Sequence, residues 1–148
     1  MTGRMLLVVA LLAACGSPAR TSPPRQPSRF ATGVAHLTVA IVDVSPQANP
    51  RSRRQELTLS LTDGAGAVHV LHRRVIDGTC ALAAARTRRD DLEADAALIA
   101  QIDCPTARPE PVRVTVALDP DALRVVAPEG TQAFATPAGF DVVTAEPP

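Results

Sequence analysis

A regular alternation of apolar and polar residues marks two neighbouring segments as the strands of a β-hairpin. From Glu56 to Thr62 every second residue is a leucine, and the positions between are acidic or carry a hydroxyl. This period of two is typical of a strand with one buried face. Residues 63–66, Asp-Gly-Ala-Gly, have turn chemistry because glycine adopts positive φ without strain. Val68 to Ile76 is therefore predicted to return as the second strand.

Other segments show related patterns. His36 to Ser45 is apolar at both alternating sets of positions, which predicts a central strand that is covered on both faces. Valines alternate with other residues from Val112 to Leu118, and a turn at residues 119–121 leads into Leu123 to Ala127, so a second hairpin is predicted. Phe140 to Thr144 is predicted to be a short last strand.

The segment from Cys80 to Cys104 fits two different structures. Its alanine content favours helix, and Asp90-Asp91 is a suitable cap for the start of one. Alternatively, the segment forms two strands around a polar turn at residues 86–91, with the cysteines opposite each other. Strand is favoured for residues 97–104, because this stretch ends at a cysteine followed by proline. For residues 80–95 the sequence supports helix and strand equally.

The predicted elements are about six short strands with turn signals between them, which favours a mostly β fold, a small antiparallel β-sandwich or open barrel. We expect one β-rich domain over residues 34–145. The alternative is an α+β fold, in which residues 80–100 form one or two helices packed on the sheet.

The first residues of the chain have a different character. Arg4 precedes an apolar run from Met5 to Leu12. A membrane-spanning helix needs about 20 apolar residues, so this run is too short to span, but it has the length of a signal-peptide core. Small residues then lead to Cys15 in the sequence Leu12-Ala13-Ala14-Cys15. This motif resembles the lipobox of bacterial lipoproteins.

The resemblance implies that residues 1–14 are removed as a signal peptide and that Cys15 becomes an acylated N-terminus. Two or more acyl chains hold a protein stably at a lipid bilayer. Gly16 follows the cysteine where an Asp tends to retain lipoproteins at the inner membrane, so the resemblance favours the outer membrane of a two-membrane bacterium. Residues 15–33 are rich in Pro, Ser and Arg and are predicted to form a disordered tether.

Composition narrows the class of function. The 15 basic residues, all arginine, are matched by 15 acidic residues, so the overall charge does not indicate a nucleic-acid partner. The chain has no Trp, no Tyr and only three Phe. Few aromatic faces are therefore present to stack on sugars, bases or quaternary ammonium groups, and the core must be aliphatic.

Three cysteines are present, and acylation of Cys15 leaves Cys80 and Cys104 as a pair. An exported protein occupies an oxidising compartment, so a disulfide between them is predicted. The chain-entropy relation gives such a bond about 3.5 kcal/mol for a loop of about 25 residues. A metal site or a redox thiol pair is disfavoured, because neither a second cysteine pair nor a CxxC motif occurs.

Two further groups of residues are candidates for a site. His69 and His72 form an HxxH pair, but residues three apart on a strand point to opposite faces, so no shared metal is expected. Several arginines form a basic patch only if the loops that carry them converge, and the acidic residues that follow them would neutralise much of it. These arginines are Arg53, Arg54, Arg73, Arg74, Arg86, Arg88 and Arg89.

The chain contains no GxSxG motif, no Gly-rich phosphate loop and no cysteine–histidine pairing in a catalytic context. We therefore expect a non-catalytic envelope lipoprotein, without a cofactor or metal, that acts as an interaction or structural module. Its expected partners are the bilayer, through Cys15, and an envelope protein. The alternatives are a small envelope hydrolase, an inhibitor of one, or a carrier of a small apolar ligand.

Overall fold

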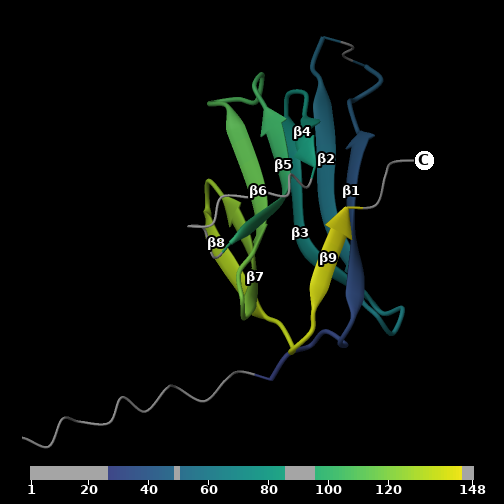
Figure 1. Ribbon diagram of the computed structural model, residues 1–148. Helices are drawn as coiled ribbons and strands as arrows, with labels where there is room; N and C mark the ends of the chain where they lie inside the picture. The colour runs from purple at the N-terminus through teal and green to yellow at the C-terminus, as the bar shows by residue number, and fades with distance from the viewer. Residues whose placement is uncertain (1–26, 49–50, 86–95, 145–148) are drawn as a thin grey trace, which may run out of the picture.

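The computed structural model describes residues 27–48, 51–85 and 96–144, which form nine strands in two sheets (Figure 1). The first sheet has the strand order β3-β2-β1-β9, and the second has the order β4-β5-β6-β7-β8. The strands are β1 (Val34–Asp43), β2 (Arg54–Thr62), β3 (Val68–Asp77), β4 (Ala81–Ala85), β5 (Ala97–Cys104), β6 (Val112–Leu118), β7 (Ala122–Ala127), β8 (Gly130–Ala135) and β9 (Asp141–Thr144).

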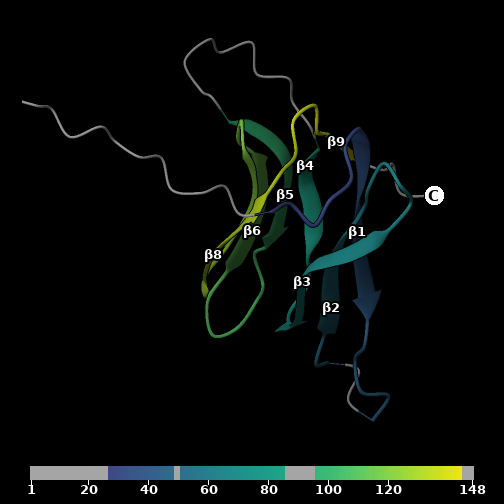
Figure 2. The same cartoon turned by 90° about the horizontal axis from the view of Figure 1, so that it is seen from below.

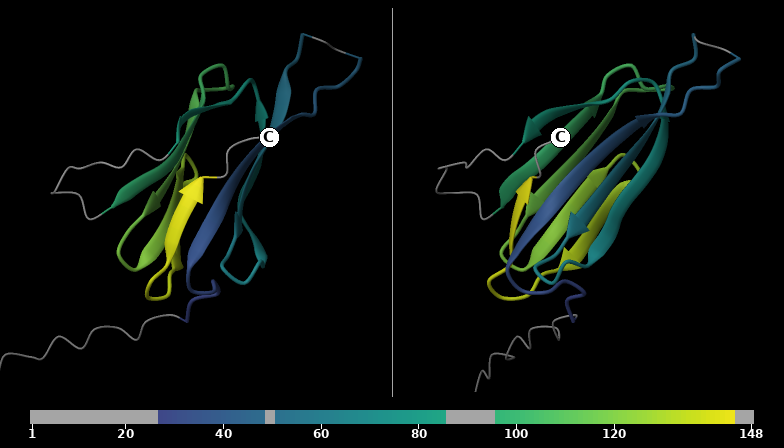
Figure 3. Two further views of the ribbon diagram at one scale, coloured as in Figure 1. Left: turned by 45° about the vertical axis from the view of Figure 1, so that its right-hand side comes forward. Right: turned by 90° about the vertical axis from the view of Figure 1, so that its right-hand side faces the viewer.

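The two sheets form two layers and do not close into a barrel, so the domain is a small β-sandwich (Figure 3). The predicted mostly β fold is confirmed, and so are both predicted hairpins, β2–β3 and β6–β7. One strand pair is parallel: β9 returns from the second sheet and pairs with β1, with Val34 opposite Asp141.

The core lies between the sheets and is aliphatic. The alternation in β2 points Leu57, Leu59 and Leu61 inward, and each is fully buried. Val114 and Val116 of β6 face them from the second sheet and are also fully buried. Burying a side chain of this size stabilises the fold by about 1.5–3 kcal/mol.

The prediction that the first strand is covered on both faces is wrong. Leu37 of β1 is fully buried, but Val34 and Val42 are 50% and 54% exposed. Both valines lie on the outer face of the first sheet, and no second layer covers that face among the described residues. The strand is central because β2 and β9 flank it, which places it inside a sheet without burying both of its faces.

The ambiguous segment between the cysteines forms strands where the structure describes it. β4 and β5 are antiparallel, with Ala81 opposite Asp103, so the strand prediction for residues 97–104 is confirmed. Residues 81–85 are also strand, which removes the helical alternative for that part. The predicted polar turn and the Asp90-Asp91 cap lie within residues 86–95, outside the described residues.

Strand β8 was not predicted from the hydrophobic pattern. Strand β7 ends at Ala127, and the chain then pairs back on β7 from Gly130 to Ala135. The first four residues of β8 are exposed, so no alternation of buried apolar side chains marks it in the sequence.

The folded domain begins earlier than predicted. The tether was expected to extend to residue 33, yet Phe30 is only 5% exposed and its ring lies 5.5 Å from that of Phe140 and 6.2 Å from that of Phe134. Figure 2 shows this N-terminal segment crossing one end of the sandwich between the two sheets. Phe30 contributes to holding the segment, because large rings bury large areas.

Asp63 ties the N-terminal segment to the β2–β3 turn. This buried carboxylate accepts hydrogen bonds from the backbone N–H groups of Ala31, Ala65 and Ala67, each at 3.0 Å. Its Oδ2 also lies 2.9 Å from Nε2 of His69. The hydrogen bonds from Ala31 and His69 lower the pKa of Asp63 to about 2, because they stabilise the charged form.

The pKa of Asp63 predicts how stability depends on pH. Because the folded-state pKa lies below the ordinary 3.8, the carboxylate stabilises the fold above about pH 4, and this contribution disappears as the pH falls through about 2. We expect Asp63→Asn to lower the free energy of unfolding at neutral pH and to flatten its decline in acid. Urea denaturation across this pH range measures both effects; parallel declines in the two proteins would contradict the assignment.

Candidate functional site

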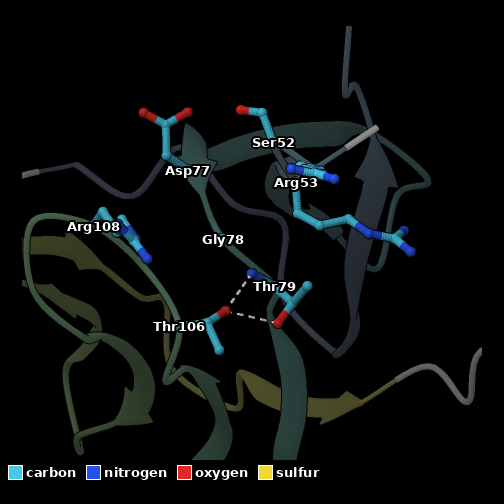
Figure 4. Close-up of a pocket in the computed structure, with 8 residues that line it drawn as sticks. Ser52, Arg53, Asp77, Gly78, Thr79, Thr106 and Arg108 are labelled. Atoms are coloured by element: carbon cyan, nitrogen blue, oxygen red, sulfur yellow. Dashed lines mark hydrogen bonds between the residues drawn. The ribbon is translucent and has the colours of Figure 1, made fainter. Parts of the chain in front are cut away.

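Three connections between strands meet at the end of the sandwich opposite the N-terminal segment (Figure 1). They surround an open polar cavity of about 510 Å³, which we call the basic pocket (Figure 4). One wall comes from the β1–β2 connection, one from the β3–β4 connection and one from the β5–β6 connection. The lining residues are Arg51, Ser52, Arg53, Asp77, Gly78, Thr79, Thr106 and Arg108.

A disulfide fixes the base of the basic pocket. Cys80 and Cys104, the pair expected from the cysteine count, are bonded in the structure, with their Cα atoms 4.0 Å apart. Cys104 is fully buried at the end of β5. The backbone N–H of Cys80 donates to Oε1 of Gln55 at 2.6 Å, which links the bond to β2 of the other sheet. The β3–β4 connection is thereby held by both layers.

Gly78 allows the β3–β4 and β5–β6 connections to approach closely. Its φ is +149°, and a Cβ at this position would lie 2.7 Å from the backbone nitrogen and Cα of Ala107. The N–H of Gly78 donates to the carbonyl of Arg53 at 2.8 Å, and the N–H of Arg108 donates to the carbonyl of Asp77 at 2.9 Å. These backbone bonds join all three connections that line the pocket.

Two threonine hydroxyls form the floor. The backbone N–H of Thr79 donates to Oγ1 of Thr106 at 2.8 Å, and the two Oγ1 atoms are also 2.8 Å apart (Figure 4). Two hydroxyl hydrogens are present and the contact between the oxygens uses one of them. One O–H donor therefore remains for a ligand, whichever threonine supplies it.

Two of the arginines at the pocket already hold counter-ions. Arg53 pairs with Asp43 at 3.2 Å, and Nε of Arg54 pairs with Oδ1 of Asp77 at 2.8 Å. Hydrogen bonds from Ser45, and then the Arg53 guanidinium, hold the pKa of Asp43 below its usual value. Each of these two aspartates is therefore the ion-pair partner of one arginine.

Arg108 is an exposed arginine of the basic pocket whose guanidinium has no ion pair with any described residue. Together with Arg51, Arg53 and Arg54 it makes four arginines, against three acidic residues at the same end of the domain, Asp43, Asp77 and the exposed Glu110. A local excess of positive charge therefore exists in a chain whose overall charge is near zero. Guanidinium groups with free N–H donors suit an oxyanion.

The structure brings together only part of the predicted basic patch. Arg53 and Arg54 lie at the pocket, whereas Arg73 pairs with Glu56 and Arg74 with Glu129, away from it. The other three predicted members, residues 86, 88 and 89, lie outside the described residues.

Arg108 was not singled out from the sequence, where it lies in a Pro-rich loop. The signal that was available is the disulfide. Because Cys80 pairs with Cys104, residues just before the first cysteine must lie near residues just after the second. Gly78 accordingly packs on Ala107, and Arg108 lines the same pocket, with its N–H bonded to the carbonyl of Asp77.

The prediction that His69 and His72 point to opposite faces is wrong. A β-bulge leaves Leu71 without a partner in β2, so His69 lies opposite Leu61 and His72 opposite Leu59. Both leucines belong to the inner face, and the extra residue turns both imidazoles the same way.

The two histidines nevertheless have separate environments. His69 contacts Asp63, a residue six positions earlier that the hairpin turn returns to it. The His72 side chain is buried, and its Nε2 has no hydrogen-bond partner within the part of the chain that the structure describes, with Oε1 of Glu129 3.7 Å away. Burial lowers the pKa of His72. Among the described residues, no group of three or more His, Cys, Asp or Glu side chains is arranged to hold a metal ion.

The predicted lipidation site, Cys15, lies outside the described residues, as do residues 1–14 and most of the predicted tether. None of the described residues belongs to a helix with the length and apolar character needed to cross a bilayer.

The fold and the pocket define a two-sheet β-sandwich with a cationic pocket where the connections of one end meet. Comparison with known protein families, characterised proteins and solved structures finds no match for this chain. What the protein does is therefore inferred from its own residues.

Gly78→Ala is expected to destabilise the domain by about 1–3 kcal/mol, because the new Cβ would both occupy strained backbone and meet Ala107. The matched control is Gly66→Ala, where φ is also positive at +81° but the space around the Cβ is open. Urea denaturation of both variants separates the cost of backbone strain, which both share, from the cost of the close contact with Ala107, which only Gly78→Ala has. Equal losses of unfolding free energy in the two variants would contradict the packing role of Gly78.

Replacing both Cys80 and Cys104 by alanine is expected to lower the free energy of unfolding by about 3.5 kcal/mol, since the bond closes a loop with a sequence separation of 24. The measurement is urea denaturation, with mass spectrometry to establish the bond in the parent protein. Free thiols in the parent protein, or unchanged stability in the variant, would contradict the assignment.

Proposed function

We propose that the protein is an exported bacterial lipoprotein, anchored through acyl chains on Cys15, whose β-sandwich is a non-catalytic interaction module of the cell envelope. The observation that carries the proposal is the lipobox-like sequence Leu12-Ala13-Ala14-Cys15 after a short apolar run. The bond between Cys80 and Cys104 supports it, because such bonds persist in oxidising compartments. By the same resemblance, Gly16 favours the outer membrane.

The position of the basic pocket supports a role in binding. In this proposal the tether reaches the domain at Phe30, and the pocket lies at the opposite end (Figure 1). β1 connects the two ends with ten residues, which span roughly 30 Å at the rise of a β-strand. The domain would then present its cationic end away from its own anchor, toward other envelope components.

The side chains of the pocket favour binding over catalysis. Its lining consists of arginines, hydroxyl residues, one glycine and Asp77. The carboxylate of Asp77 is already paired with Arg54, and no hydrogen bond joins it to a serine or threonine among the described residues. A carrier of apolar ligands is also disfavoured, because Leu59, Val114 and their neighbours fill the space between the sheets.

Cys15→Ser is expected to abolish acylation and move the protein from the membrane fraction to the soluble fraction, because the variant lacks the thiol that would carry the diacylglyceryl group. The measurement is membrane fractionation together with mass spectrometry of the mature N-terminus. Ser17→Ala, which leaves the cysteine intact, is the control and is expected to sediment like the parent. Sedimentation of Cys15→Ser with membranes at the parent level would refute the anchor.

A further inference from the structure

We propose that the basic pocket binds a phosphate group of a ligand other than the bilayer that anchors the protein. This assignment adds a class of ligand to the proposed function. It rests on that function in one respect, because the proposed anchor determines the direction in which the pocket faces. The chemistry itself rests on the donors of three connections: the guanidinium groups of Arg53 and Arg108, and the hydroxyls of Thr79 and Thr106.

The donors approach from several directions. Figure 4 shows Arg108 and Arg53 on either side of Gly78 and the Thr79 and Thr106 hydroxyls below it, with the Arg53 side chain extended toward β1, where it pairs with Asp43. A carboxylate has two oxygens in one plane and is satisfied by a single guanidinium fork. A tetrahedral phosphate has up to three free oxygens in different directions, so it suits donors that are spread over several walls.

The donors are free to serve a ligand. Arg108 has no counter-ion among the described residues. Arg53 is 65% exposed at its side chain and pairs with Asp43 through one nitrogen, so further N–H groups of its five remain. The threonine pair keeps one O–H hydrogen that neither partner uses.

The carboxylate of Asp77 is the one acidic side chain among the lining residues. Its repulsion of a phosphate is offset by Arg54, whose Nε lies 2.8 Å from Oδ1 of Asp77. The excess of arginine over aspartate at this end of the domain therefore remains to attract an anion.

The pocket is also preorganised. Gly78 packs against Ala107, and the Cys80–Cys104 bond lies next to Thr79 and two residues from Thr106 in the chain, so the floor does not have to be ordered when a ligand arrives. The arginines are solvated, which limits the gain from each contact. We expect free inorganic phosphate to bind with a dissociation constant of roughly 1 mM, equivalent to about 4 kcal/mol.

The test titrates the mature acylated protein, in neutral detergent and at constant ionic strength, with inorganic phosphate by calorimetry. The variant Arg53→Gln/Arg108→Gln is expected to bind phosphate at least about tenfold more weakly, because two charge-assisted contacts are lost. The control is Arg73→Gln/Arg113→Gln, which removes the same number of charges from side chains that, like Arg53, are 65% exposed and ion-paired but lie outside the pocket. It is expected to bind like the parent, and acetate is expected not to compete.

Thr106 provides a second variant that separates binding from folding. Thr106→Val removes the hydroxyl and is expected to weaken phosphate binding about threefold or more. Thr106→Ser keeps the hydroxyl and is expected to bind phosphate like the parent. Thermal unfolding of both variants identifies any loss of fold. If phosphate does not saturate the parent, or if the control loses affinity equally, or if acetate competes equally, the phosphate assignment is overturned.

The source of the phosphate is tested with the Cys15→Ser protein, which lacks the acylated cysteine. Glycerol 3-phosphate is expected to bind it with the same dependence on Arg53 and Arg108. Phosphatidylglycerol vesicles are expected not to bind; binding that requires these arginines would assign the pocket to a lipid headgroup and overturn the proposed source. Fractionation tests the anchor separately, so failure of the anchor and failure of the phosphate site are distinguishable.

Discussion

The passage of the chain from one sheet to the other, at Gly78, Thr79 and Cys80, is the constraint on which this end of the protein depends. The disulfide to Cys104 joins this crossing to the second sheet, while the hydrogen bond from Cys80 to Gln55 joins it to the first. Three connections of quite different sequence therefore meet in a fixed geometry. The contacts that hold this crossing give the pocket of exposed arginines a fixed floor.

The opposite end of the sandwich is closed by other means. Phe30 packs there against two further phenylalanines, and Asp63 gathers hydrogen bonds from the N-terminal segment and from its own turn. Between these ends the core consists of Leu, Val, Ile and Ala, with few large rings. Since a domain is stable by only about 5–15 kcal/mol, one cross-link worth about 3.5 kcal/mol is a considerable share of the total.

Local patterns predicted the strands with a clear buried face, such as the leucines of residues 56–62, because side-chain alternation records burial directly. They did not predict β8, which is largely exposed, or the pairing of β9 with the first sheet. The bulge at Leu71 places the His72 side chain on the opposite face of β3 from the one that strict alternation predicts. A one-residue shift of this kind cannot be recognised from composition. Arg108 joined the site through the disulfide, a contact distant in sequence.

Amide hydrogen exchange in the oxidised and the reduced protein tests the central claim most directly. The account predicts that the N–H groups of Gly78, Thr79 and Arg108, each hydrogen-bonded across the crossing, are protected when the Cys80–Cys104 bond is intact. On reduction they should lose protection while the centre of β2 keeps it. Equal protection of these three amides with and without the bond would show that the disulfide does not hold the floor of the pocket.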